Sequence, residues 1–160
     1  MGRDSEDESA HSLLKYIAKN TSLPVLVVPK SHNPKVPNRA VLVSDLDPKK
    51  QVKLAPFFEI IRKVSHELSI LNVKSNYFSN AKEALTWIQN LNTTYGLNAK
   101  LLMHEDTDKI SDLKNYMEKN QVDLFCTVRY NKSIFDKIFG RRLPNQLTNQ
   151  LEVPVLVIKE

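Results

Sequence analysis

Glycine, cysteine and long apolar runs are all scarce in this chain of 160 residues. Its three glycines, Gly2, Gly96 and Gly140, lie far apart. The single cysteine, Cys126, excludes an internal disulfide, and its apolar neighbours predict a buried thiol rather than a nucleophile. No apolar run approaches the roughly 20 residues that span a bilayer, so we expect no membrane insertion.

The N-terminal segment lacks the features of a secretory signal, because it is acidic and has no basic flank followed by an apolar stretch. We therefore expect a cytoplasmic protein. The four histidines show no metal-ligand spacing, and no nucleophile is paired with a base. These features predict neither a metal centre nor an enzyme.

The net charge of +5 raises the question of nucleic-acid binding. Lysine and arginine are scattered along the chain, however, and no aromatic-rich basic motif accompanies them. A solvated surface of mixed charge is the favoured interpretation, and nucleic acid is the weakest of the candidate partners.

An internal repeat gives the first information on organisation. The segment Leu23 to Val28 returns as Val153 to Ile158, 130 residues later, which is the length of a domain. The match extends upstream, where Ile17 corresponds to Leu147. The alternative is that two buried strands resemble each other by chance.

A proline-rich segment separates the two copies and predicts a linker over residues 29–38, since its three prolines disfavour a regular strand or helix. We therefore expect residues 1–28 to be the final helix and strand of a first repeat. Residues 39–160 should form one complete domain.

Apolar runs alternate with helical periods throughout residues 39–160. Short apolar runs predict buried strands near residues 40–43, 70–73, 100–104, 124–128 and 154–158. Between these runs, apolar residues recur at helical spacing in four segments, which begin at Leu54, Ala84, Ile110 and Leu143. Leu68 belongs to the first of these patterns and Leu85 to the second. This order predicts an α/β fold with a doubly wound, five-stranded parallel sheet of Rossmann-like type and helices on both faces. Ligands would bind at the carboxyl ends of the strands.

Four of these segments resemble the universal stress protein family as an ordered set. They are the strand ending in Val43-Ser44-Asp45, the strand from Leu68 to Val73, the segment from Val122 to Val128, and the closing strand from Val153 to Ile158. The resemblance covers residues 39–160. It implies an adenine nucleotide alpha hydrolase-like fold and a role in the stress response.

ATP-binding members of that family carry a loop of the form Gly-x-x-Gly-x9-Gly-Ser/Thr after the fourth strand. Its glycines let the backbone approach the phosphates closely. The corresponding positions here are Val128, Asn131, Arg141 and Arg142, and Gly140 lies one place away. Because side chains occupy those positions, we expect weak or no ATP binding and no cofactor.

Two further positions match the family's ligand-binding residues. Asp45 corresponds to the adenine-contacting aspartate, and Val73 would line the base pocket. Asp45 has a structural alternative as a helix cap. The basic loop 129–142 leaves a second function open, that of a small-ligand or nucleotide sensor. The simpler interpretation is that this loop is a solvated basic surface.

The resemblance also implies how the protein makes contacts, because in this family the last strand of one domain pairs antiparallel with that of a partner domain. Candidates for this pairing are the strands that contain Val25, Val27, Val155 and Val157. We therefore expect a non-enzymatic stress-response protein that forms a homodimer or closes on its own first-repeat strand.

Overall fold

The computed structural model describes residues 21–29, 33, 35–44, 51–65, 67–72, 81–103, 110–129 and 152–159. The elements in these ranges are β1 (Val25–Val27), β2 (Arg39–Ser44), α2 (Gln51–Val64), β3 (Glu67–Asn72), α3 (Ala81–Tyr95), β4 (Asn98–Met103), α4 (Ile110–Lys119), β5 (Leu124–Arg129) and β6 (Val155–Lys159). The helices expected before β1 and before β6 lie outside the described residues.

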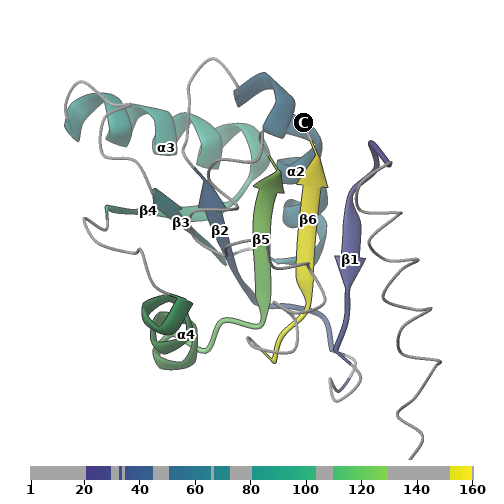
Figure 1. Ribbon diagram of the computed structural model, residues 1–160. Coiled ribbons are helices and arrows are strands. Elements are labelled where there is room, and N and C mark those ends of the chain that lie inside the picture. Colours follow the sequence, from purple (N-terminus) through teal and green to yellow (C-terminus); the bar gives the residue numbers. More distant parts are fainter. Residues whose placement is uncertain are drawn as a thin grey trace, which may run out of the picture.

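One six-stranded sheet organises these elements, in the order β1-β6-β5-β2-β3-β4 (Figure 1). Every neighbouring pair is parallel except β1 with β6. The chain runs outward from β2 to β3 and β4, then returns to the other side of β2 and continues through β5 to β6. The predicted doubly wound parallel sheet is therefore confirmed, with β1 added as an antiparallel sixth strand.

Both faces of the sheet are covered, which explains why its central strands read as continuous apolar runs. Ala40 and Leu42 of β2 pack on the face of α2 and α3, whereas Val41 and Val43 pack on the face of α4. The helices α2 and α3 also touch each other through Phe58 and Tyr95, whose ring centroids are 5.2 Å apart. Two apolar layers thus enclose the sheet.

Two residues of the predicted helical patterns, Leu68 and Leu85, do not lie on a buried helix face in the structure. Leu68 lies in β3, because α2 ends at Val64 and the chain turns at Ser65 into the strand. Leu85 lies in α3 but is 63% exposed, since that helix faces the sheet through Ala84 and Leu91. Helical spacing alone did not show that Leu68 belongs to the following strand or that Leu85 faces solvent.

A side chain covers part of the β4 edge of the sheet. The amide of Asn92 accepts a hydrogen bond from the Ala99 N–H at 2.7 Å and donates one to the Ala99 carbonyl at 3.1 Å. Among the described strands β4 is the last on this side, so none of them lies beside these backbone groups. Asn92 therefore occupies hydrogen-bonding groups that would otherwise be open to another chain.

Candidate functional site

The chain reverses its winding direction between β2 and β5, and the carboxyl ends of these strands are where ligands bind in a doubly wound sheet. Val43 of β2 lies opposite Thr127 of β5 near that end. Thr127 is 3% exposed, which makes it a buried polar residue at this edge. Its hydroxyl has no hydrogen-bond partner among the described residues. Sequence reasoning did not single out Thr127, because one threonine in an apolar strand gives no distinctive signal.

Of the six residues predicted to contact a ligand, the structure describes only Val128. The other five, Asp45, Val73, Asn131, Arg141 and Arg142, lie outside the described residues. Val128 pairs with Ile158 of β6, is 6% exposed and packs in the layer under α2 and α3. The position that would open the family's phosphate loop is therefore a paired strand residue, and β5 continues to Arg129.

Cys126 lies in the same strand, fully buried among apolar side chains, as its neighbours in the sequence indicated. Burial raises the pKa of its thiol, because the thiolate would lose its hydration. The sulfur is thus held protonated, which is the opposite of what a nucleophilic cysteine requires.

The four valines predicted to form a pairing surface come together at the other edge of the sheet. Val25 lies opposite Val157 and Val27 lies opposite Val155 in an antiparallel pair within the chain. Val27, Val155 and Val157 are buried. Beyond β1 the sheet has no further strand in the described part of the chain.

This edge also carries exposed apolar side chains. Leu23, Leu26 and Val28 are 70%, 55% and 52% exposed. Large apolar groups gathered on and around a terminal strand mark either a contact surface or a risk of aggregation.

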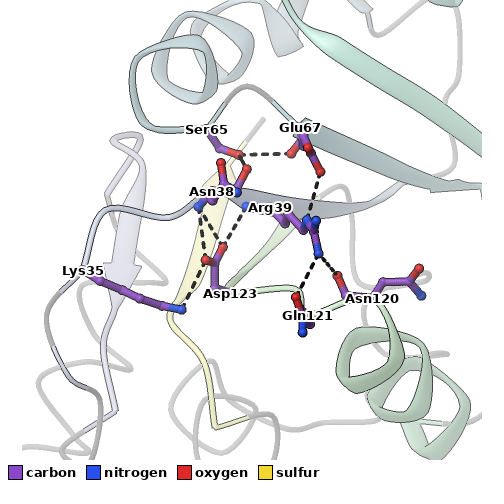
Figure 2. Close-up of polar contacts among 8 residues, drawn as sticks. All are labelled: Lys35, Asn38, Arg39, Ser65, Glu67, Asn120, Gln121 and Asp123. Atoms are coloured by element: carbon purple, nitrogen blue, oxygen red, sulfur yellow. Dashed lines mark hydrogen bonds and ion pairs between the residues drawn. The ribbon is translucent and has the colours of Figure 1, made fainter.

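A cluster of polar contacts ties the chain before β2 to the loop before β5, at the amino ends of the strands (Figure 2). The Asp123 carboxylate accepts hydrogen bonds from the Asn38 N–H (3.1 Å to each oxygen) and the Arg39 N–H (2.9 Å). Lys35 Nζ lies 3.4 Å from Oδ2. The Asp123 N–H in turn donates to the Arg39 carbonyl at 3.0 Å. We call these contacts the Asp123 clasp.

Ser65 and the Arg39 side chain extend the clasp to the start of β3. The Ser65 hydroxyl donates to the Asn38 carbonyl at 2.6 Å and lies 3.0 Å from the Glu67 carbonyl. The Arg39 guanidinium contacts Glu67 Oε2 at 3.0 Å, the Asn120 carbonyl at 3.3 Å and the Gln121 side chain at 3.2 Å. Figure 2 shows that these groups point toward one another.

The clasp binds backbone groups, so it fixes where the chain before β2 enters the sheet. Sequence reasoning missed it. The available signal was an acidic residue, Asp123, next to the apolar run of a buried strand, but its partners lie about 85 positions away in the chain.

The described residues contain no group of three or more His, Cys, Asp or Glu side chains placed to hold a metal ion. They also contain no helix with the length and apolarity that crossing a membrane requires.

Comparisons with models of known protein families and with curated proteins find no match. Among solved structures, a universal stress protein from Archaeoglobus fulgidus DSM 4304 superposes with a TM-score of 0.56 and 14% sequence identity, over 92% of this chain and 54% of that one. The chain has the universal stress protein fold. It spans about half the length of the Archaeoglobus protein.

A second universal stress protein, solved in complex with cAMP, gives a TM-score of 0.47 and 13% identity over 78% of this chain and 98% of that one. In a doubly wound sheet the ligand edge lies at the switch point, which here falls between β2 and β5.

Proposed function

We propose that this chain is a non-enzymatic, universal stress protein-like module that works through contacts at the β1–β6 edge and does not bind ATP. The observation that carries the proposal is the edge itself. It combines an antiparallel strand pair with exposed apolar side chains at Leu23, Leu26 and Val28.

Two observations support the proposal that the chain does not bind ATP: the residue types at the loop positions and the pairing of β5 with β6. Three glycines would let the backbone wrap the phosphates, and none stands at the matching positions. At the first of these positions, Val128 is buried and paired with Ile158. A phosphate group would need space that a core side chain holds.

The experiment is a thermal-shift titration with ATP, ADP and AMP, with and without Mg²⁺. A ligand that binds only the folded protein raises its melting temperature, by an amount that grows with concentration. We expect no shift with any of the three nucleotides at millimolar concentration. A saturable rise with ATP would refute the absence of nucleotide binding.

The alternative function is a small-ligand sensor at the β2–β5 edge. Thr127 favours it, because its buried hydroxyl lies at the carboxyl ends of these strands. Under this alternative Asp45 and the basic loop 129–142 would contact the ligand. Arg141→Ala with Arg142→Ala would then abolish any stabilisation seen in the titration, and a shift that survives both changes would exclude the basic loop as its cause.

The domain organisation belongs to the same proposal. We propose that residues 1–28 end a first stress-protein repeat and that residues 39–160 form a second. The 130-residue repeat supports this division, and so does the place of β1 beside β6, the strand to which it corresponds in sequence.

A further inference from the structure

The two faces of β1 differ in burial. Val27 is 8% exposed, whereas Leu26 and Val28 are 55% and 52% exposed. Successive side chains of a strand point to opposite faces of a sheet, so Leu26 and Val28 share one face and Val27 lies on the other. The register identifies the open face, because Leu26 lies opposite Leu156 of β6, which packs in the layer under α2 and α3. The open face of β1 therefore continues the buried face of β6.

The sequence repeat indicates what covers such a face. Leu26 corresponds to Leu156, which lies 130 residues later. Val28 corresponds in the same way to Ile158. Leu156 and Ile158 are 5% and 4% exposed, because they belong to the apolar layer to which α2 contributes. Equivalent residues are thus buried where α2 lies over them and open where no described helix does.

The spacing of helices and strands leaves β1 for one further helix. Packed helices lie about 8 to 10 Å apart and neighbouring strands about 4.8 Å, so one helix covers roughly two strands. The layer under α2 and α3 already draws on β2, β3, β4, β5 and β6. Figure 1 shows β1 at the end of the sheet, beyond β6. A third helix beside α2 would lie over β1.

The apolar face of α2 shows which side chains this layer accepts. Its four core residues recur at the spacing i, i+3, i+4 and i+7, and each is at most 2% exposed: Leu54, Phe57, Phe58 and Ile61. This spacing is how an amphipathic helix is read when it docks on an apolar surface. The described helices α2, α3 and α4 already use their own apolar faces against the sheet. The helix that fits over β1 is therefore none of these three.

We propose that Leu26 and Val28 form a docking ledge for an amphipathic α-helix of a partner protein, whose apolar residues have the spacing found in α2. The helix lies beside α2 and extends the apolar layer from β6 onto β1. The strand β1 stays paired with β6 throughout. This inference rests on the proposed function through contacts at the β1–β6 edge, and it names the kind of partner that makes them.

A fluorescently labelled synthetic peptide of residues 51–64 is the probe. It carries Pro56→Ala so that the free peptide forms a helix more readily, and Pro56 is exposed in α2, so the apolar face is unchanged. Fluorescence anisotropy with increasing amounts of the full chain should show saturable binding, with a dissociation constant below about 1 mM. Leu26→Asp in the chain should weaken binding roughly tenfold or more, because it places a carboxylate against the apolar face of the peptide.

Matched controls separate docking from general stickiness. Leu85→Asp makes the same substitution at a residue that is 63% exposed on α3, which contacts β4 at the other edge of the sheet. This variant should bind the peptide as the parent chain does. A second peptide with Phe57→Asp interrupts the apolar face and should bind roughly tenfold or more weakly. If circular dichroism shows that Leu26→Asp does not fold, Val28→Asp takes its place, because Val28 lies one residue beyond β1.

The docking ledge would be overturned by a parent chain that shows no saturable binding, or by equal binding to the parent and to Leu26→Asp. Light scattering tests the other occupant. A parent chain that is dimeric, and that Leu26→Asp makes monomeric, would show that a second copy covers the ledge and would also overturn the proposal. The nucleotide titration is independent of these results. A failed peptide test with no nucleotide shift would remove the docked helix and leave the absence of ATP binding in place.

Discussion

At the scale of single residues, Asp123 has more structural consequence than its place in the sequence indicates. It is 9% exposed and accepts hydrogen bonds from two backbone N–H groups of the chain entering β2. Removing the carboxylate would leave those donors without their partner in a partly buried place. The cost of such an unsatisfied group exceeds the net value of an ordinary hydrogen bond.

Asp123→Ala should therefore lower the free energy of unfolding by about 2 kcal/mol. Urea denaturation followed by circular dichroism measures this change. Glu59→Ala is the control, because Glu59 pairs with Arg62 on an exposed helix surface and such pairs contribute roughly 0 to 1 kcal/mol. Equal losses for the two variants would show that the clasp does not hold the chain before β2.

Cys126 gives a prediction about pH. Burial raises its pKa above the usual 9.0, so the folded chain keeps the proton longer than the unfolded chain does. Its contribution to stability is complete below pH 9.0 and is lost as the pH rises above that value, where only the unfolded thiol ionises. The stability advantage of the parent over Cys126→Ala should shrink by about 1.4 kcal/mol between pH 8 and pH 10. Urea denaturation at the two pH values measures it, and a constant difference would contradict the effect.

At the scale of elements, the two edges of the sheet are treated differently. The β4 edge is covered by the Asn92 side chain, which occupies the N–H and carbonyl of Ala99. The β1 edge carries no comparable side chain among the described residues and exposes Leu26. The protected edge resists pairing with another chain, and the open one permits it.

Asn92→Ala should lower the free energy of unfolding by about 1 to 2 kcal/mol and make the protein more prone to aggregate through β4. Thr93→Ala is the control, because the Thr93 hydroxyl donates to the Gln89 carbonyl at an exposed position of α3. Thermal unfolding with static light scattering separates the two effects. An Asn92→Ala variant as stable and as soluble as the control would show that the edge needs no cover.

Much of the element order followed from the sequence alone. Buried strands such as β2 and β5 form continuous apolar runs, and local spacing located α2, α3 and α4. The ends of elements were predicted less accurately, because Leu68 continues the helical spacing of α2 but lies in β3. Burial was also predicted less accurately, since Leu85 fits the helical spacing of α3 but is exposed. The clasp could not be predicted, since contacts between Asn38 and Asp123 depend on how distant segments pack.

At the scale of the whole molecule, the fold offers two places for function. The carboxyl ends of β2 and β5 form the ligand edge of a doubly wound sheet, and most residues predicted to act there lie outside the described ranges. At the β1–β6 edge the structure describes both strands, which form an antiparallel pair with exposed apolar groups beside it. The sequence repeat indicated that the two strands correspond, and the sheet register shows that they pair with each other.

Hydrogen exchange of the backbone amides, with and without ATP and Mg²⁺, tests most directly whether the β1–β6 edge rather than a nucleotide site carries the function. We predict that amide exchange in β1 becomes slower as protein concentration rises, because contacts between molecules at the β1–β6 edge would keep water from its backbone. ATP should leave residues 127–129 unchanged. Slower exchange at residues 127–129 with ATP, together with concentration-independent exchange in β1, would contradict the account.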